Sequence, residues 1–296
     1  MRRRPIEPLG AALAALGVEV SYLGQPGCPP IRLQRQAAPA GRATIHGSQS
    51  SQYASGLAMV APLLPRGLTL ELDGELVSLP YLDMTLAMMG RAGAEVARQD
   101  RLLTISGRGY DPSGTIAIER DWSAAAYLLV GAQLTGRDIQ VRGLTPPPES
   151  LQGDSAIVDL LARLSEGQTT FDLTHTPDLI GPLTAACLFA QAPVRIRGAA
   201  HTRVKECDRV AVLCRELGKL GAQLTAHDDG LDVEPLPAIP TIRCLLEPAS
   251  DHRMAMTFGL LSLRIPVIEV ATPQCVSKSF PGFWEVLAQL SAAPNS

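Results

Sequence analysis

The sequence predicts a mixed α/β protein of two lobes, each built from copies of one repeated unit. Three observations support this prediction. A pattern of polar cap, small-residue helix, strand, polar loop, second helix and closing strand occurs four times in the 296 residues. A chain of this length suggests about two domains. The stretch "ISGRGYDPSGTIAI", residues 105–118, is rich in Gly, Pro and Ser and marks a boundary. We therefore expect lobes over residues 1–118 and 119–296.

The four copies follow one another with their segments in the same order. Their first helices are expected at residues 50–64, 122–134, 176–190 and 251–263. Their strands are expected at residues 68–74, 138–144, 193–199 and 266–272. Their second helices are expected within residues 78–96, 150–164, 203–224 and 276–290. The first helices are apolar on nearly all sides and should be buried, whereas the second are amphipathic and should cover the outside.

The start of the chain has the form of the second half of a copy. In "RRPIEPLGAALAALGVEVS", residues 3–21, Arg4 precedes Pro5 as Lys278 precedes Pro281. We therefore expect residues 1–118 to hold one complete repeat plus a fragment, and residues 119–296 to hold three repeats. The segment behind the arginines is an amphipathic helix start instead of an apolar run of about 7–15 residues, which argues against a secretory signal.

The composition argues against several classes of binding partner. A net charge of −3 and a pI near 6.0 argue against nucleic-acid binding, which requires a basic excess. No apolar run reaches the roughly 18 residues that a membrane span requires. The six cysteines include no CxxC pair, so neither a zinc site nor a disulfide framework is implied. We expect a soluble cytoplasmic protein with reduced thiols.

Each copy places a helix N-terminus and a polar loop at the same end of its unit. The copies begin near Ser51, Ser123, Asp178 and Arg253, and their polar loops follow at Ser78, Gln152, Lys205 and Lys278. Helix N-termini present unpaired N–H groups that attract anions. These ends, together with the cations on the loops, predict a concave site for phosphate and carboxylate groups.

Each of these motifs also has a purely structural interpretation. The segment "TRVKECDR" at residues 202–209 could be a solvated helix start with local ion pairs, and Arg253 could pair locally with Asp251. Lys278 could be an ordinary surface lysine, and Ser50 or Ser51 could simply cap a helix. The segment "HDDGLDV" at residues 227–233 is better interpreted as a hairpin turn than as a metal cluster.

An ordered set of motifs resembles one known family. The motifs are "RRRPI", "GSQSSQY", "SLPYLDMT", "SLQGD", "HTPD", "RVKECDR", "DHRMAM" and "SKSFPGFW". Together they resemble 5-enolpyruvylshikimate-3-phosphate (EPSP) synthase, also called 3-phosphoshikimate 1-carboxyvinyltransferase. The sequence departs from the family in "DWSAAAYLL", where Gly-Asp-x-Ser-Ser-Ala is usual, and at His201, where asparagine is usual.

The resemblance implies a two-lobed inside-out α/β barrel of repeated βαβαββ units, with the N-terminal units of the second lobe missing here. It implies transfer of the enolpyruvyl group of phosphoenolpyruvate to the 5-hydroxyl of shikimate 3-phosphate, with release of phosphate. This reaction belongs to the shikimate pathway of aromatic amino acid biosynthesis, and the family is the target of glyphosate. Neither a metal nor an organic cofactor is expected.

The resemblance also implies a role for each matching residue. Shikimate 3-phosphate would contact Ser50, Ser51, Gln52, Ser78, Tyr81, Asp178 and Lys205. Phosphoenolpyruvate would contact Arg4, Gln52, Arg209, Arg253 and Lys278. Asp178 would be the general base for the 5-hydroxyl, and Glu206 would transfer protons at the enolpyruvyl methylene.

Two alternatives remain open from the sequence. One is the sister enolpyruvyl transferase that acts on UDP-N-acetylglucosamine. The other is a truncated non-catalytic or split-enzyme fragment that needs an N-terminal partner. Apolar surfaces where absent repeats would pack predict self-association or partner binding in that case.

Overall fold

The structure is a computed structural model that describes residues 2, 4–35 and 41–291. It contains two compact units, Met1–Ile118 and Glu119–Ser296, called here the N-terminal and C-terminal units. Within the described residues, strands form two four-stranded sheets and two two-stranded sheets, all of them open. The mixed α/β class is confirmed.

A four-stranded sheet organises the N-terminal unit. Its strands are β3 (Arg42–His46), β4 (Leu68–Asp73), β5 (Val96–Gln99) and β6 (Leu102–Ile105), in the spatial order β3-β4-β6-β5. β3 and β4 are parallel, and the other two pairings are antiparallel. Along β4, Leu68, Leu70 and Leu72 are buried and alternate with polar residues, which is the pattern of a sheet with one covered face.

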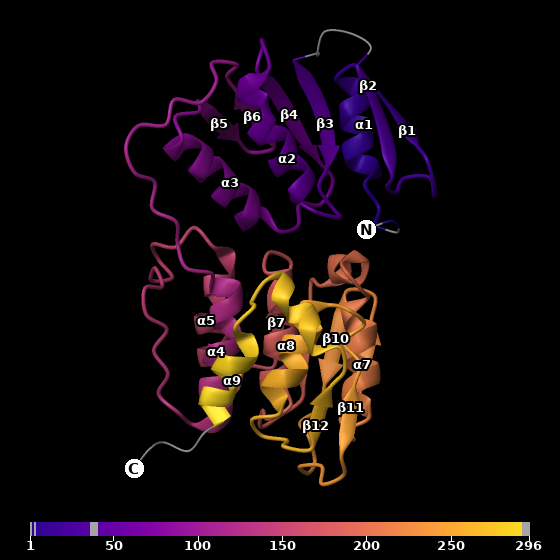
Figure 1. Ribbon diagram of the computed structural model, residues 1–296, viewed down its shortest axis with the longest axis vertical. Coiled ribbons are helices and arrows are strands. Elements are labelled where there is room, and N and C mark those ends of the chain that lie inside the picture. Colours follow the sequence, from indigo (N-terminus) through magenta and orange to yellow (C-terminus); the bar gives the residue numbers. More distant parts are fainter. Residues whose placement is uncertain (1, 3, 36–40, 292–296) are drawn as a thin grey trace. The chain divides into compact units, whose positions relative to one another are not determined.

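Three helices cover that face of the sheet (Figure 1). They are α1 (Glu7–Ala15), α2 (Gln52–Val60) and α3 (Leu79–Arg91), and the short turn η1 (Ala61–Leu63) extends α2. An antiparallel hairpin of β1 (Val18–Tyr22) and β2 (Ile31–Arg35) follows α1. The segment from β3 to β6 therefore has the order βαβαββ.

The C-terminal unit repeats this sheet. Its strands are β7 (Thr170–Asp172), β8 (Val194–Arg197), β9 (Leu224–His227) and β10 (Gly230–Val233), in the order β7-β8-β10-β9. β7 and β8 are parallel, and the other pairings are antiparallel. The helices α6 (Ile180–Cys187) and α7 (Arg209–Gly218), preceded by the turns η3 (Pro177–Leu179) and η4 (Ala200–Val204), complete a second βαβαββ unit. The hairpin predicted in "HDDGLDV" is confirmed, since β9 and β10 pair across Asp228 and Asp229.

The remaining elements of this unit form shorter versions of the repeat. β11 (Cys244–Leu246) and β12 (Ile268–Val270) are parallel and are joined by α8 (His252–Leu261). The turn η5 (Pro273–Lys278) and α9 (Phe283–Ser291) follow them. The segment after β6 leads to α4 (Trp122–Thr135), and η2 (Gly153–Ala156) and α5 (Ile157–Ser165) come before β7.

The strand predicted at residues 138–144 is wrong. Residues 136–150 contain neither helix nor strand. The predicted strand is followed, after Thr145, by Pro146, Pro147 and Pro148, which have no backbone N–H to donate to a sheet. The carbonyl of Thr145 instead accepts a hydrogen bond from the indole Nε1 of Trp122 at 3.0 Å.

The core of the C-terminal unit is made by α4, α6 and α8, which pack against one another. All 8 residues of α6 are buried, and Arg253 is the one residue of α8 that is not. A methyl group added at Gly181 would lie 2.2 Å from Oγ1 of Thr257, so α6 and α8 approach closely only because glycine stands there. The burial predicted for the first helices is confirmed for α6 and α8, whereas α4 is only partly buried.

The equivalent helix of the N-terminal unit is less covered. Met59 and Val60 of α2 are 49% and 47% exposed. A methyl group added at Gly56 would meet no atom within 4 Å. The prediction of a buried first helix therefore holds for α6 and α8 and only in part for α2 and α4.

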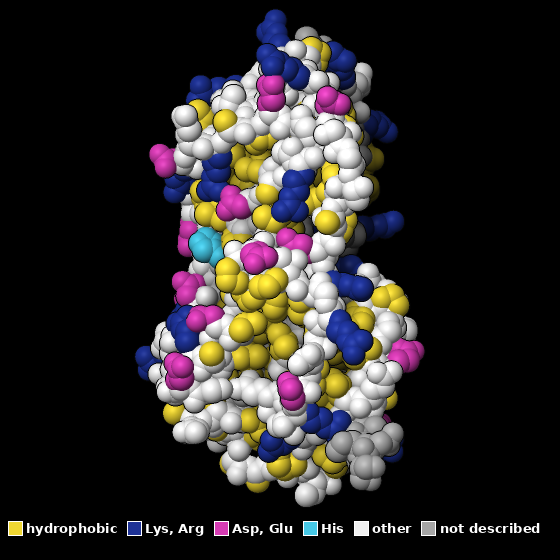
Figure 2. All heavy atoms as spheres, turned by 90° about the vertical axis from the view of Figure 1, so that its left-hand side faces the viewer, with side chains coloured by type: hydrophobic (Ala, Val, Ile, Leu, Met, Phe, Trp, Pro, Cys, Tyr) yellow, Lys and Arg dark blue, Asp and Glu magenta, His cyan; other side chains and the backbone are white. Residues whose placement is uncertain are grey.

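Charges of both signs are mixed on the surface. On the face shown in Figure 2, Lys and Arg side chains are interspersed with Asp and Glu side chains, in keeping with the net charge of −3. None of the helices in the described part of the chain is both long and apolar enough to cross a bilayer.

Candidate active site

A charged cluster lies at the N-terminal ends of helices in the C-terminal unit. Its centre is Arg209, the first residue of α7, whose side chain is 1% exposed. The helix begins there because Asp208 caps it, accepting a hydrogen bond from the backbone N–H of Ala211 at 3.0 Å. The sequence thus places a long cation directly at a helix start inside the protein.

Each nitrogen of the Arg209 guanidinium has its own carboxylate partner. Nε donates to Oδ2 of Asp251 at 2.8 Å, and Nη1 donates to Oδ1 of Asp178 at 2.9 Å. Nη2 donates to Oε2 of Glu206 at 3.2 Å. A guanidinium this deeply buried requires such pairing, because an isolated buried charge is strongly unfavourable.

Arg253 joins the same cluster from the start of α8. Its Nη2 lies 2.8 Å from Oδ2 of Asp178. Its backbone N–H donates to Oδ1 of Asp251 at 2.8 Å, which makes Asp251 the N-cap of α8. Asp251 thus binds the backbone of Arg253, and the guanidinium of Arg253 reaches Asp178.

Lys278 closes the other side of the cluster. It ends η5, and its Nζ lies 2.5 Å from Oε1 of Glu206. Glu206 thus binds Arg209 through one oxygen and Lys278 through the other. The Lys278 side chain is 58% exposed and forms this ion pair with Glu206.

The cations keep both carboxylates ionised. Burial opposes ionisation of Asp178, but the positive charges of Arg253, Arg209 and Lys205 outweigh burial and lower its pKa well below the usual range. Burial likewise opposes ionisation of Glu206, but its hydrogen bond to Lys278 and the charge of Arg209 lower its pKa to about 2. Groups that take over these cations would therefore raise both pKa values.

His201 lies in the turn η4, which leads to Lys205. It is 5% exposed, and its Nε2 has no hydrogen-bond partner among the described residues. Burial and, next, the charge of Lys205 lower the pKa of His201 to about 4. The imidazole is therefore neutral at pH 7.

A second set of predicted residues comes together in the N-terminal unit. Nη2 of Arg4 donates to Oε1 of Gln52 at 3.3 Å, and the backbone N–H of Gln52 donates to Oγ of Ser50 at 3.2 Å. Ser50, Ser51 and Ser78 are buried. The hydrogen bond from Gln52 to Ser50 supports the helix-start interpretation for Ser50 alone.

Ser78 precedes α3 in a strained backbone conformation. Its φ of 59° lies in the left-handed region, where a residue other than glycine is uncommon. Its buried Oγ has no hydrogen-bond partner among the described residues. Its carbonyl accepts a hydrogen bond from the backbone N–H of Tyr81 at 3.2 Å. Backbone strain and an unused hydroxyl are common at ligand sites.

The polar residues in the second copy of the sequence repeat form hydrogen bonds within that copy. Ser123 donates to Asp154, and the side chain of Gln152 accepts from the backbone N–H of Trp122 at 2.9 Å. Ser123 and Gln152, which the repeat placed near the predicted anion site, thus have structural partners.

Asp251 is the residue whose role the sequence did not indicate. It contacts both Arg209 and Arg253 and is completely buried. The available signal was an aspartate directly before an apolar helix, which predicts a cap but gives no information about the distant Arg209.

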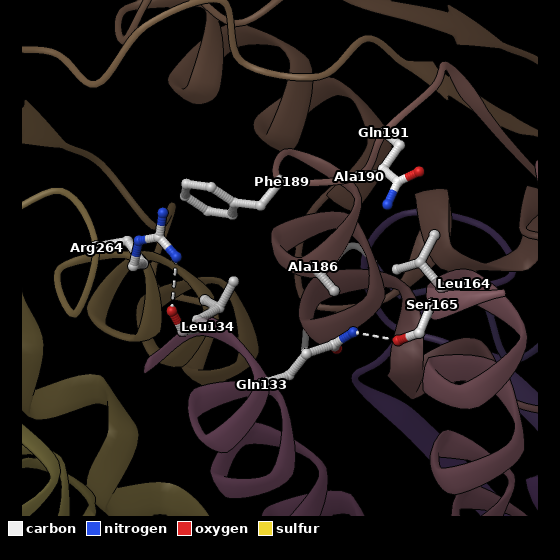
Figure 3. Close-up of a pocket in the computed structure, with 9 residues that line it drawn as sticks. All are labelled: Gln133, Leu134, Leu164, Ser165, Ala186, Phe189, Ala190, Gln191 and Arg264. Carbon is white, nitrogen blue, oxygen red and sulfur yellow. Dashed lines mark hydrogen bonds between the residues drawn. The ribbon is translucent and has the colours of Figure 1, made fainter. Parts of the chain in front are cut away.

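A cavity of about 260 Å³ lies at the opposite, C-terminal ends of α4 and α6 (Figure 3). Its lining is Gln133, Leu134, Leu164, Ser165, Ala186, Phe189, Ala190, Gln191 and Arg264. Arg264 donates to the carbonyl of Leu134 at 2.9 Å and lies over the ring of Phe189. A cation that binds a carbonyl at a helix C-terminus has a structural role there, and no predicted site residue lines this cavity.

Solved structures with the same fold define the class. The chain superposes on EPSP synthase from Acinetobacter baumannii with a TM-score of 0.74 and 22% identity, covering 98% of this chain and 71% of that one. It superposes on the enolpyruvyl transferase NikO from Streptomyces tendae with a TM-score of 0.69 and 18% identity, covering 98% of this chain and 72% of that one. The fold is therefore that of enolpyruvyl transferases.

Sequence comparison then identifies the family. The family profile "EPSP synthase (3-phosphoshikimate 1-carboxyvinyltransferase)" matches residues 1–287. A 3-phosphoshikimate 1-carboxyvinyltransferase of Methanoculleus marisnigri is 38% identical, with 97% of this chain and 71% of the relative covered. One of Laribacter hongkongensis is 37% identical, with 99% and 72% covered. The chain belongs to the EPSP synthase family, and these relatives do not favour the UDP-sugar alternative.

Proposed function

We propose that this chain transfers the enolpyruvyl group of phosphoenolpyruvate to the 5-hydroxyl of shikimate 3-phosphate. The observation that carries the proposal is the cluster in which Asp178 lies between Arg209 and Arg253. Both substrates carry a phosphate and a carboxylate, and fixed guanidinium groups bind such anions in bidentate fashion. Membership of the EPSP synthase family supports the same reaction.

The residues of the two units receive separate roles. In the C-terminal unit, Arg209, Arg253 and Lys278 bind phosphoenolpyruvate, and Lys205 and Asp178 bind shikimate 3-phosphate. In the N-terminal unit, the residues proposed for shikimate 3-phosphate are Ser50, Ser51, Gln52, Ser78 and Tyr81. Arg4 and Gln52, which are hydrogen-bonded to each other, contact phosphoenolpyruvate.

The reaction proceeds by addition and then elimination. In the addition, the 5-oxygen bonds to C2 of phosphoenolpyruvate, Asp178 takes the hydroxyl proton and Glu206 gives a proton to C3. In the elimination, C3 returns a proton to Glu206, the bond from C2 to the phosphate oxygen breaks, and the departing phosphate takes the proton from Asp178. General acid–base groups of this kind work best when their pKa lies near the working pH.

Substrate anions adjust the two carboxylates for this task. Asp178 and Glu206 are ion-paired with Arg253 and Lys278. A phosphate or carboxylate that binds these cations competes with the carboxylates, so the pKa of each carboxylate rises when the anion binds. Binding of the substrate therefore makes Asp178 a better proton acceptor and allows Glu206 to hold the proton that it gives to C3.

A phosphate-release assay tests the proposal. We expect release from phosphoenolpyruvate to depend on shikimate 3-phosphate and to fail when UDP-N-acetylglucosamine replaces it. Lys278→Ala should lower the rate at least tenfold. Arg163→Ala is the matched control, because Arg163 forms an exposed ion pair with Asp159 on α5. Phosphate release without shikimate 3-phosphate, or none at all, would contradict the proposal.

We also propose that the open side of α2 binds a further helical segment. In the C-terminal unit, the equivalent helix α6 is enclosed by α4 and α8. Met59 and Val60 are exposed on α2, and Gly56 offers the close approach that Gly181 provides in α6. The occupant we favour is the part of the relatives that this chain does not match, since the chain covers 71% of the Methanoculleus relative.

Copurification tests this binding surface. The chain should copurify with the unmatched segment of the Methanoculleus relative, and Gly56→Leu should abolish the complex. Gly218→Leu, at an exposed position of α7 where an added Cβ would meet no atom within 4 Å, serves as the control. A stable homodimer in sedimentation, or a complex insensitive to Gly56→Leu, would refute the proposed occupant.

We propose a cytoplasmic location. The six cysteines are free thiols, as expected where disulfides are kept reduced. Fractionation should recover the protein with cytoplasmic markers, and recovery from a secreted or membrane fraction would contradict this.

A further inference from the structure

Asp251 connects the two arginines of the cluster through a single carboxylate. Oδ1 accepts the backbone N–H of Arg253, and Oδ2 accepts Nε of Arg209, both at 2.8 Å. The Sγ of Cys207 also lies 3.6 Å from Oδ2, which ties the loop before α7 to the start of α8. Asp251 therefore holds residues from two separate elements.

Helix capping alone does not account for this arrangement. Asp121 caps α4 by accepting the backbone N–H of Ala124 at 3.1 Å, and it does so from an exposed position. Asp251, in contrast, is 0% exposed. Burying a carboxylate is unfavourable unless a charged partner compensates for the lost hydration. Arg209 is that partner, so Asp251 has two roles: it caps α8, and it pairs with Arg209.

The contact fixes the direction of the Arg209 guanidinium. The group is planar, so holding Nε also sets the directions of Nη1 and Nη2. These two nitrogens face Asp178 and Glu206, the carboxylates proposed for proton transfer. Asp178 in turn pairs with Arg253. One buried carboxylate thus sets the position of Arg209 relative to Arg253.

We propose that Asp251 is a positioning residue that orients Arg209 and Arg253 toward the same bound oxyanion. The inference rests on the proposed function, because the oxyanion is a phosphate or carboxylate of phosphoenolpyruvate. Asp251 does not touch the substrate itself and acts through the two arginines.

Calorimetric titration of phosphoenolpyruvate into Asp251→Asn tests this role. Asparagine keeps an oxygen for the cap, but its amide nitrogen cannot accept the Nε–H of Arg209. We expect the Kd to rise at least tenfold. In the matched control Asp121→Asn, the Kd should stay within twofold of wild type. Equal Kd values for wild type and Asp251→Asn would overturn the proposal.

A second readout separates positioning from general destabilisation. In spectra of ¹⁵N-arginine-labelled protein, the Nε–H of Arg209 should exchange slowly with solvent in wild type and in Asp121→Asn. It should lose this protection in Asp251→Asn. Rapid exchange in folded wild type would overturn the proposal without any variant. If wild type does not bind phosphoenolpyruvate, the proposed function fails, and slow exchange still shows whether Asp251 holds Arg209.

A double-mutant cycle completes the test. If Asp251 acts through Arg209, Asp251→Asn should change the Kd less than twofold in an Arg209→Lys background. Full additivity of the two effects would show that Asp251 acts independently of Arg209 and would overturn the proposal.

Discussion

Arg253 pairs with Asp178 at 2.8 Å, although Asp251 is only two residues away in the sequence. Asp251 is occupied by the backbone N–H of Arg253 and by the guanidinium of Arg209. The result is an alternating arrangement in which Asp178 and Asp251 each contact both arginines. The cations are therefore held in place by the protein before any anion binds, which is the preorganisation that an anion site requires.

Removing the central cation should strongly destabilise the C-terminal unit. Arg209→Met leaves the buried Asp251 without its charged partner. Breaking a buried ion pair on one side costs about 3–5 kcal/mol. We expect a loss of this size in the free energy of unfolding by urea denaturation. Arg108→Met, at an exposed pair with Glu95, should change it by less than about 0.5 kcal/mol.

Binding of phosphoenolpyruvate should take up protons. The anion competes for Arg253 and Lys278, and the pKa values of Asp178 and Glu206 then rise from their lowered positions. A carboxylate whose pKa rises binds a larger fraction of a proton at a fixed pH near that pKa. Calorimetry at pH 5 in buffers with different ionisation enthalpies measures this number. The phosphate of phosphoenolpyruvate itself releases protons on binding at this pH, so the uptake is judged against Glu206→Gln. An equal number of protons in wild type and Glu206→Gln would contradict the competition between substrate and Glu206.

His201 should make the stability depend on pH between about 4 and 6.5. Its pKa is about 4 in the folded protein, against 6.5 for an unperturbed histidine, so in this range the unfolded chain binds the additional proton. The neutral imidazole therefore makes its full contribution to the free energy of unfolding above pH 6.5. This contribution decreases as the pH falls from 6.5 to 4, by at most about 1.4 kcal/mol per pH unit.

Replacement of His201 tests this pH dependence. His201→Asn should decrease the slope of the unfolding free energy against pH in this range. A slope that is the same in His201→Asn and wild type would show that His201 does not cause the dependence.

The close contact of α6 and α8 can be tested at one position. A methyl group in Gly181→Ala would lie 2.2 Å from Oγ1 of Thr257, and such overpacking costs about 1–3 kcal/mol. Gly56→Ala has open space in α2 and should stabilise by up to about 1 kcal/mol through helix propensity. Thermal and urea unfolding would measure both. Equal effects at the two glycines would contradict the described packing.

The sequence contained enough information for much of the fold. The apolar helices α6 and α8 and the alternating strand β4 follow directly from residue patterns. The segment 138–144 also has strand-like residues, yet it forms no strand. Residue preferences show that a segment is able to adopt the strand conformation, but a strand also needs a neighbouring strand to pair with.

The contacts within the site were harder to predict from the sequence, for a similar reason. The motifs indicated which residues would gather, and the structure brings Asp178, Glu206, Arg209, Arg253 and Lys278 together. The partner of each charge depends on three-dimensional packing. Asp251 shows the limit, since its sequence neighbours predict only a helix cap, and its contact with Arg209 spans 42 residues.

Titration of phosphoenolpyruvate into wild type and Arg253→Ala tests the central claim most directly. A hydrogen bond to a charged group contributes about 1.5–3 kcal/mol, which corresponds to roughly 10- to 100-fold in affinity. We predict saturable binding to wild type and to Arg163→Ala, with the Kd raised at least tenfold in a folded Arg253→Ala. Equal affinity of wild type and Arg253→Ala would contradict the assignment of the charged cluster as the substrate anion site.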